Sequence, residues 1–412
     1  MASSLVNEKE KQLEEKHLIH TFGRYGVEFV KGKGAHLYDI EGNEYLDFLS
    51  GIAVCSLGHC NEKVVHALQE QVGKLMHVSN YYYIEGRGEA AGKFNNLLNF
   101  GSDNPKTWKV FFTNSGAESN ECALKIARYL ANRKHGNDGA HTKVVVLKKS
   151  FHGRTFETLA ATAQDRFHVG LNPMSPVFIE VDANDEEQLK DTFCDWGDNI
   201  SAMIAEPIQG ESGVHPLTTS YMQLIRQLTK DNDALMILDE VQTGLYRSGC
   251  PYAFQLCDVV PDVVTMAKGI GDGFPCGVCA ATGEAAEVLQ PGDHGTTFGG
   301  GPLAMAAINA TLDELERLDT LSNVALVGAY MRNKLECIEE IVEVRGKGLM
   351  LGAQLKPGID AHDVVENALL REKLVINATG DDTLRFLPPL VITKGDVDEF
   401  IVRLERAIKA SV

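Results

Sequence analysis

The sequence predicts an α/β protein, with a large domain built on a mostly parallel central sheet and a smaller α+β domain beside it. The first observation is a set of short runs rich in Val, Ile, Leu and Met: KVVVL (143–147), SAMIA (201–205), ALMIL (234–238) and DVVTM (262–266). Runs that do not alternate with polar residues are typical of parallel strands buried on both faces. The second observation is that helical patterns at 118–133 and 219–232 separate these runs, as in a doubly wound sheet.

The two ends of the chain predict the smaller domain. GAHLYDIEGNEYLDFLSG (34–51) has the pattern of a β-hairpin that turns around Gly42. Towards the C-terminus helical patterns dominate, at 303–318 and 396–412, with the short strand-like TLRFLPP (383–389) between them. The expected division is an N-terminal segment (1–60) packing with the small domain, a large domain (61–301) and a small C-terminal domain (302–412).

Composition and charge exclude several classes of function. The chain has 412 residues, with 39 Lys and Arg against 57 Asp and Glu, and a formal net charge of −18. Such a surface repels nucleic acid and anionic membranes, so an anionic substrate must be bound by a few locally placed arginines. No apolar run is long enough to span a membrane, and MASSLVNEKEKQLEEKH resembles neither a signal peptide nor a transit peptide. Nine cysteines without a disulfide-like framework fit a reducing compartment, so we expect a cytoplasmic protein.

Polar and charged side chains follow the predicted strands where each strand ends. Ligands of open parallel sheets bind beyond the carboxyl ends of the strands. The residues at these ends are the segment SFHGR (150–154), Glu206, Asp239 with Glu240, and Lys268. Any one of them alone is explained as a solvated strand end, but the complementary set predicts a single site.

Lys268 is the residue that indicates the chemistry. It follows the apolar run 262–266 and precedes a run of glycines in KGIGDG. A lysine at such an edge, with Asp239 nearby, suits pyridoxal phosphate, whose aldehyde reacts with an amine and whose ring nitrogen pairs with a carboxylate. Burial among apolar neighbours lowers the pKa of a lysine and frees its amine to react. Lys148 and Lys149 also follow a strand, but two adjacent like charges suit a solvated edge.

A phosphate-binding turn is predicted in FFTNSGAESNE (111–121). A strand-like start leads through small residues to a helix, so the backbone N–H groups of Ser115, Gly116 and Ala117 would face an anion at the positive end of the helix dipole. The alternative is simple N-capping by Asn114 or Ser115, and the two interpretations are compatible.

Two other features are weaker signals. Cys276 and Cys279, in CGVC, have the spacing of a redox or metal pair, but without a second pair we interpret them as small packed residues and expect no metal site. His152 is expected to be a structural neighbour of Phe151 and not a base.

Six motifs follow one another from about Phe22 to Phe386. They are NSGAESNECALKIAR, SFHGRTFETLAAT, IAEPIQGESGV, LDEVQTGLYRSG, TMAKGIGDGFPCG and HGTTFGGGPLA. In order and spacing they resemble the class III (ω-amino acid) aminotransferases of pyridoxal phosphate fold type I. Within that family, SLGHCNEKVVHAL followed by KLMHVSNYYY is most similar to acetylornithine aminotransferases and their ornithine-type relatives.

The resemblance implies a role for each cofactor-binding residue. Lys268 would bind pyridoxal phosphate covalently, and Asp239 would hold the proton on the ring nitrogen. Gln242 would donate a hydrogen bond to the phenolic oxygen of the ring. Val241 and Phe151 would enclose the ring from its two sides.

The resemblance also implies a homodimer with shared active sites. In HGTTFGG, Thr297 of the partner subunit would reach the phosphate. A monomer would then have an incomplete site.

Two unlike substrates would share one pocket. Arg154 would bind the α-carboxylate of a long donor, and also the side-chain carboxylate of glutamate or 2-oxoglutarate. Arg385 would bind the α-carboxylate of glutamate close to the ring, and Glu211 would mask Arg385 with a salt bridge while the long donor is bound. The alternative for Arg385 is a purely structural ion pair.

The implied reaction is a ping-pong transfer of the terminal amino group of N-acetylornithine to 2-oxoglutarate. Its products are N-acetylglutamate 5-semialdehyde and glutamate, as in arginine biosynthesis. Ornithine, succinylornithine or another ω-amino donor fits the same two arginines. An aminomutase is disfavoured because it would not need the Glu211–Arg385 pair, and a nucleotide-binding module is disfavoured because GIGDG lacks the GxGxxG order.

Overall fold

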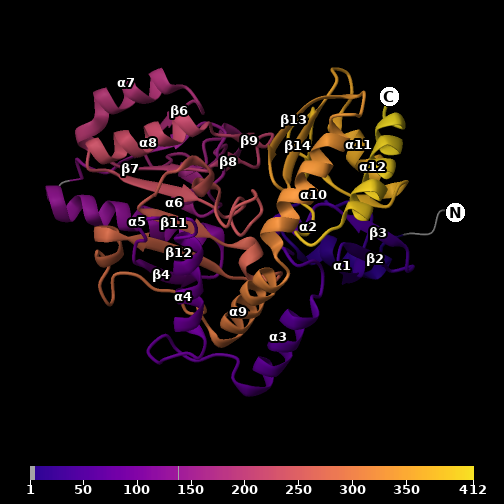
Figure 1. Cartoon of the computed structure of the whole chain (residues 1–412), viewed down its shortest axis with the longest axis horizontal. Helices are drawn as coiled ribbons and strands as arrows, with labels where there is room; N and C mark the ends of the chain where they lie inside the picture. Colours follow the sequence, from indigo (N-terminus) through magenta and orange to yellow (C-terminus); the bar gives the residue numbers. More distant parts are fainter. Residues whose placement is uncertain (1–4, 138) are drawn as a thin grey trace.

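Two groups of strands and helices organise the chain, at left and right in Figure 1. The left group surrounds a seven-stranded sheet, and the right group combines the C-terminal strands and helices with the N-terminal strands β1–β3. This computed structural model describes residues 5–137 and 139–412, so residues 1–4 and 138 lie outside the described residues.

The large sheet is mostly parallel. In spatial order its strands are β4 (Trp108–Thr113), β12 (Gly277–Thr282), β11 (Val263–Met266), β10 (Leu235–Asp239), β7 (Ile200–Ala205), β5 (Lys143–Leu147) and β6 (Phe178–Val181). β12 runs antiparallel to both of its neighbours, and the other neighbouring pairs are parallel. Every residue of β7 and β10 is buried, because helices cover both faces. The predicted α/β fold with a mostly parallel central sheet is confirmed.

Different helices cover the two faces of this sheet. The flanking helices are α4 (Arg87–Leu98), α5 (Gly116–His135), α6 (Phe156–Ala161), α7 (Glu186–Trp196), α8 (Thr219–Asp231) and α9 (Pro302–Arg317). Val144 and Val146 of β5 belong to the core that contains the buried side of α5. Val145 and Leu147 belong to the opposite core, with buried residues of α8 and α9. This alternation is the two-residue period of a strand, and it explains why the apolar runs are continuous.

Smaller sheets form the right-hand group and a link to the large sheet. Their orders are β1-β2-β3-β15, β13-β14-β17-β16 and β8-β9. The strands are β1 (Phe29–Lys33), β2 (His36–Asp39), β3 (Glu44–Asp47), β8 (Ile208–Gln209), β9 (His215–Pro216), β13 (Ile341–Lys347), β14 (Met350–Leu355), β15 (Leu374–Val375), β16 (Asn377–Ala378) and β17 (Thr383–Phe386). β2 and β3 form the predicted hairpin, and β3 pairs in parallel with β15. The indigo N-terminal strands therefore lie beside the yellow C-terminal helices (Figure 1).

The remaining helices lie mainly in the right-hand group. They are α1 (Glu8–His17), α2 (Ser50–Ala53), α3 (Glu62–Lys74), α10 (Thr320–Leu335), α11 (Ala361–Leu370) and α12 (Lys394–Lys409). Short 3₁₀ helices lie in the connections: η1 (Asp165–Phe167), η2 (Gly197–Asn199), η3 (Ala253–Cys257), η4 (Lys268–Gly271) and η5 (Gly283–Glu287). Across residues 5–137 and 139–412, no helix combines the length and the apolar character needed to cross a membrane.

The prediction for the C-terminal third was incomplete. The strand-like TLRFLPP contains β17 as predicted, but β17 belongs to a four-stranded sheet whose members β13 and β14 were not predicted. β13 carries Glu343, Arg345 and Lys347 at alternate positions, and within it only Gly346 is buried. Such a strand lacks the apolar pattern by which the strands of the large sheet were found.

A cluster of aromatic rings joins the N-terminal segment to α12. A capping box at Thr393 and Asp396 starts this helix, because each side chain accepts a hydrogen bond from the backbone N–H of the other. Further along, Phe400 stacks on Phe48 with 4.1 Å between ring centroids and meets Phe386 edge-on at 5.0 Å. Phe48, Phe386 and Phe400 are fully buried.

We expect Phe400→Ala to lower the free energy of unfolding by about 3–5 kcal/mol, because it leaves a cavity between two buried rings. Urea denaturation measures this loss. Val402→Ala, on the same helix at a side chain that is 49% exposed, is the matched control, and we expect it to change the free energy by less than about 0.5 kcal/mol. Similar losses in the two variants would contradict the packing described.

Candidate active site

The carboxyl ends of the parallel strands surround a cavity of about 430 Å³. The predicted site residues that line it are Ser115, Gly116, Ala117, Phe151, Arg154, Glu211, Asp239, Val241, Gln242 and Lys268. Arg385 adjoins this set through contacts with Glu211 and Gln242. Thr297 does not line the cavity of its own chain, and its side chain is exposed.

Lys268 lies immediately beyond β11 and begins η4. Its φ of 49° is in the left-handed region, which costs a residue other than glycine about 1–3 kcal/mol and is found most often at functional sites. Burial lowers the pKa of Lys268, and Glu211 opposes this effect only in part. The amine is therefore neutral, and able to act as a nucleophile, in a larger fraction of molecules than a surface lysine would be.

Asp239, the last residue of β10, is held in place by hydrogen bonds with three residues. Asn120 Nδ2 donates to Asp239 Oδ2 over 2.8 Å, and His152 Nδ1 lies 2.8 Å from the same oxygen. The backbone N–H of Val241 donates to the other oxygen, Oδ1, over 3.0 Å. The carboxylate is 4% exposed, so its charge faces the cavity and the groups that orient it.

The sequence prediction missed the contribution of Asn120 and understated that of His152. Asn120 lies on α5 about one turn after Gly116, and its Oδ1 accepts a 2.6 Å hydrogen bond from Thr265 of β11. The spacing from the predicted phosphate turn was the signal that could have found it. His152 is a partner of Asp239 as well as the chain neighbour of Phe151.

Two buried glutamates lie at the cavity: Glu206 lines it, and Glu240 follows Asp239 in the chain. Burial raises the pKa of Glu206 to about 7, and it raises the pKa of Glu240 to about 7 as well. Glu206 accepts hydrogen bonds from the backbone N–H groups of Phe151 (2.9 Å) and Gly210 (3.3 Å). It therefore ties together the two loops that follow β5 and β7.

The turn predicted to bind phosphate lies at the start of α5. Ser115 is the N-cap, and its hydroxyl accepts a hydrogen bond from the backbone N–H of Glu118 over 3.2 Å. A Cβ atom at Gly116 would lie 2.9 Å from Val241 Cγ1, so only glycine lets Val241 approach this turn so closely. N-capping and free N–H groups at the helix start coexist here, as the sequence allowed.

The buried Arg385 and the partly exposed Glu211 form an ion pair 2.6 Å long. Arg385 Nη1 also donates to the carbonyl of Gly210 over 2.9 Å, and Gln242 Nε2 donates to Glu211 over 3.2 Å. Burial raises the pKa of Glu211, but the charges of Arg385 and Lys268 outweigh burial and lower the pKa to about 2. The pair is therefore ionised at neutral pH, and Glu211 masks the Arg385 guanidinium.

Arg154, unlike Arg385, has no acidic side chain paired with it among the described residues. No described residue forms a hydrogen bond or ion pair with it, and its guanidinium carbon lies 3.7 Å from the ring centroid of Phe167 and 5.3 Å from that of Phe151. Cation–π contacts hold the side chain while leaving its N–H groups free for a carboxylate. Phe167, on η1, was not predicted, because it lies in a long connection without a periodic pattern.

These features fit pyridoxal phosphate. The cavity combines an oriented buried carboxylate, a lysine of lowered pKa and the N–H groups at the start of a long helix. These groups match respectively the ring nitrogen, the aldehyde and the phosphate of that cofactor.

The chain matches one family along most of its length. A family model described as Aminotransferase class-III matches residues 23–408. The acetylornithine aminotransferase of Caldanaerobacter subterraneus subsp. tengcongensis is 43% identical over 396 residues, which cover 95% of this chain and 97% of that relative. The acetylornithine aminotransferase of Methanocaldococcus jannaschii is 41% identical over 397 residues, with coverage of 95% and 96%.

Solved structures show the same fold. The ornithine aminotransferase of Toxoplasma gondii ME49 has a TM-score of 0.90 and 31% identity, and the match covers 98% of this chain and 95% of that one. The acetylornithine aminotransferase of Elizabethkingia anophelis has a TM-score of 0.85 and 31% identity, with coverage of 98% and 99%. A second Toxoplasma gondii ornithine aminotransferase structure (TM-score 0.91, 30% identity, coverage of 99% and 96%) has pyridoxal phosphate at partial occupancy in its active site. The resemblance inferred from the six motifs is confirmed.

We expect Lys268→Met to raise the free energy of unfolding of the cofactor-free protein at neutral pH. The pKa of Lys268 is lower in the folded chain than its ordinary value of 10.5. At neutral pH the folded wild-type protein must therefore either keep a charged amine buried or release its proton, and either one costs free energy. Between the lowered pKa and 10.5 the unfolded chain holds more protons, so the wild-type stability rises with pH and the gain from Lys268→Met shrinks. Urea denaturation between about pH 7 and pH 10 measures this gain. A gain that is the same at every pH would show that the amine charge is not its cause.

Proposed function

This chain belongs to the class-III aminotransferases, and on that premise we propose that it transfers the terminal amino group of N-acetylornithine to 2-oxoglutarate. The family uses pyridoxal phosphate, and the products would be N-acetylglutamate 5-semialdehyde and glutamate, a step of arginine biosynthesis. The observation that carries the proposal is one site with a free arginine, Arg154, and a masked arginine, Arg385. The acetylornithine aminotransferases at 43% and 41% identity support the choice of donor.

In the proposed mechanism, this chain's residues orient the cofactor and move one proton. Bound pyridoxal phosphate supplies an aldehyde that reacts with amines and a ring that withdraws electrons from the reacting carbon. Asp239, oriented by Asn120 and His152, keeps a proton on the ring nitrogen. Lys268 Nζ would hold the cofactor at rest and would take the proton from the substrate carbon.

Other residues hold the cofactor in this orientation. The N–H groups of Ser115, Gly116 and Ala117 bind the phosphate. Val241 and Phe151 enclose the ring. Gln242, which bonds to Glu211 and Arg385, would donate to the phenolic oxygen of the ring.

Discrimination between the two substrates follows from the different states of the arginines. Arg154 binds the α-carboxylate of the long donor, whose reacting amine is at the other end of the molecule. Glu211 then masks Arg385, which would otherwise be a buried cation without a partner. Glutamate brings a second carboxylate close to the ring, and this carboxylate displaces Glu211 from Arg385.

We also propose a homodimer in which Thr297 of the partner subunit completes the phosphate site. Several large side chains near this segment are exposed: Tyr81 (94%), Tyr82 (64%), Tyr83 (106%) and Phe298 (65%). Exposed aromatic side chains in such a group are typical of a surface that another protein covers.

The domain division and the compartment are part of the same proposal. The separate sheets support an N-terminal segment (1–60), a large domain (61–301) and a small domain (302–412). The cysteines that the structure describes are unbridged, which supports the cytoplasm as the compartment.

Ornithine is the second candidate donor, since the fold also matches an ornithine aminotransferase with a TM-score of 0.90. A half-reaction distinguishes the donors. Each of N-acetylornithine, ornithine, succinylornithine and a simple ω-amine is added separately to the purified protein with its cofactor, and the loss of the absorption band of the lysine-bound cofactor is followed. We expect the fastest loss with N-acetylornithine. A faster loss with another donor would reassign the substrate, and no loss with any of them would reject the proposed reaction.

Lys268→Ala should abolish turnover and leave the fold intact, because it removes the amine that holds the cofactor and moves the proton. Multiple-turnover assays and circular dichroism measure the two effects. Lys148→Ala, which removes an exposed lysine paired with Asp182, is the matched control and should retain activity. Appreciable turnover in Lys268→Ala would overturn the assignment.

Glu211→Ala should favour α-amine donors over terminal-amine donors, since Arg385 is then always unmasked. We expect the ratio of kcat/KM for N-acetylornithine to that for glutamate to fall by about tenfold, which corresponds to about 1.4 kcal/mol. Half-reaction rates with each donor give this ratio. An unchanged ratio would remove Glu211 from the discrimination.

A further inference from the structure

The turn that carries Glu211 is held at both ends by arginines of one sheet. This turn joins β8 to β9, and its carbonyl groups at Gly210 and Gly213 lie on either side of Glu211. Arg385 of β17 donates to the Gly210 carbonyl over 2.9 Å, and Arg345 of β13 donates through Nε to the Gly213 carbonyl over 3.0 Å. The sheet β13-β14-β17-β16 therefore fixes the turn that masks one of its own arginines.

Arg345 is itself firmly anchored to this sheet. Its Nη1 donates to Glu343 and to Gln354, each over 2.7 Å, and its Nη2 donates to Thr383 Oγ1 over 3.1 Å. These partners lie on β13, β14 and β17. None of these contacts of Arg345 involves Glu211 or Arg385.

Gly213 and Val214 restrict the turn on the C-terminal side of Glu211. Gly213 has a φ of 113°, and a Cβ atom there would lie 2.7 Å from His215 Nε2 and 3.3 Å from Arg345 Nη2. Val214, the next residue, is fully buried in a cluster with Ile208. Ser212 lies between Gly210 and Gly213, its hydroxyl is buried without a partner among the described residues, and its backbone interacts with the His215 ring.

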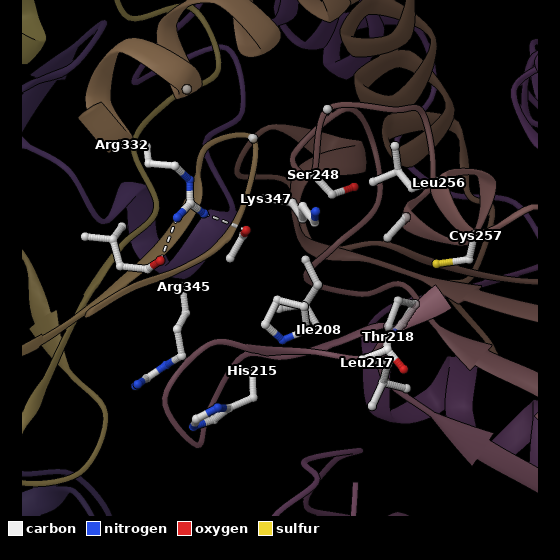
Figure 2. Close-up of a pocket in the computed structure, with 18 of the residues that line it drawn as sticks. Ile208, His215, Leu217, Thr218, Ser248, Leu256, Cys257, Arg332, Arg345 and Lys347 are labelled. Carbon is white, nitrogen blue, oxygen red and sulfur yellow. Dashed lines mark hydrogen bonds between the residues drawn. The ribbon is translucent and has the colours of Figure 1, made fainter. Parts of the chain in front are cut away.

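A cavity borders the hairpin on the side away from the candidate active site. Its volume is about 880 Å³, and Ile208 lines both this cavity and the candidate active site. Figure 2 shows Arg345 and His215 together on the wall of this cavity, with the end of Arg345 beside the His215 ring. Arg332 in the same view is occupied by the carbonyls of Val344 and Gly346. The hairpin separates the two cavities, and the arginine contacts hold its turn in addition to the packing of Ile208 and Val214.

We propose that Arg345 is a positioning residue for substrate discrimination. Its hydrogen bond to Gly213 holds the turn in the position from which Glu211 pairs with Arg385 when a terminal-amine donor is bound and separates from Arg385 when glutamate is bound. The identity of the two donors rests on the proposed function. Arg345 does not touch the substrate, and it acts through Glu211.

The test compares Arg345→Gln with the control Glu343→Gln, which removes the carboxylate partner of Arg345 and leaves the Gly213 hydrogen bond. We expect Arg345→Gln to lower the ratio of kcat/KM for N-acetylornithine to that for glutamate by about tenfold, because a loosened turn masks Arg385 less often. Glutamate should retain its rate, the cofactor absorption band should be unchanged, and Arg345→Lys should recover part of the ratio. Glu343→Gln should keep the wild-type ratio.

A second measurement does not depend on which donor the enzyme uses. Hydrogen exchange of the backbone amides in residues 208–216 should be faster in Arg345→Gln than in the wild type or in Glu343→Gln. If Arg345→Gln does not fold, Gly213→Ala disturbs the same contact from the other side and should change exchange and ratio in the same directions. Unchanged exchange, or equal losses of rate for both donors, would overturn the role of Arg345. A wild-type protein that reacts with no terminal-amine donor would reject the proposed function, and the exchange result would still decide whether Arg345 positions the turn.

Discussion

The arrangement of the site depends on one constraint: the parallel strands β5, β7, β10 and β11 end at the same edge of the sheet. This edge brings Asp239 and Lys268 to one cavity, although they belong to different strand ends and are 29 positions apart in the sequence. Helices on both faces bury the strands, and the same burial lowers the pKa of Lys268. The fold thus creates the environment in which an amine can react.

The charged side chains of the site differ in whether another side chain pairs with them. Asp239 is oriented by Asn120 and His152, and Arg385 is neutralised by Glu211, whereas Arg154 has only aromatic partners. The net charge of the protein is −18, but Arg154 has no acidic partner among the described residues and is available at the site to bind an anion. In our proposal the unpaired arginine receives every substrate, and the paired one responds to the second carboxylate of glutamate. The turn held by Arg345 connects that response to the small sheet.

The sequence predicted the large sheet and most of the residues that line the cavity, because each strand is a continuous apolar run and each polar residue stands at its end. It did not predict β13, which lacks a regular apolar pattern, or the short strand β14 that pairs with it. Nor did it predict the contacts between residues far apart in the chain. Arg345 and Gly213 are 132 positions apart and Asn120 and Asp239 are 119 apart, and no local pattern links such pairs. Their effect arises only when the strands and the two groups of sheets are packed together.

The central claim is that Lys268 is the residue that holds the cofactor at the sheet edge. The most direct measurement is to treat the purified protein containing pyridoxal phosphate with borohydride, which makes the bond between a lysine amine and the cofactor aldehyde permanent, and to locate the label by peptide mass spectrometry. The account predicts a pyridoxyl group on the peptide that contains Lys268 and on no other peptide. A label on Lys148 or Lys149, or no label at all, would contradict it.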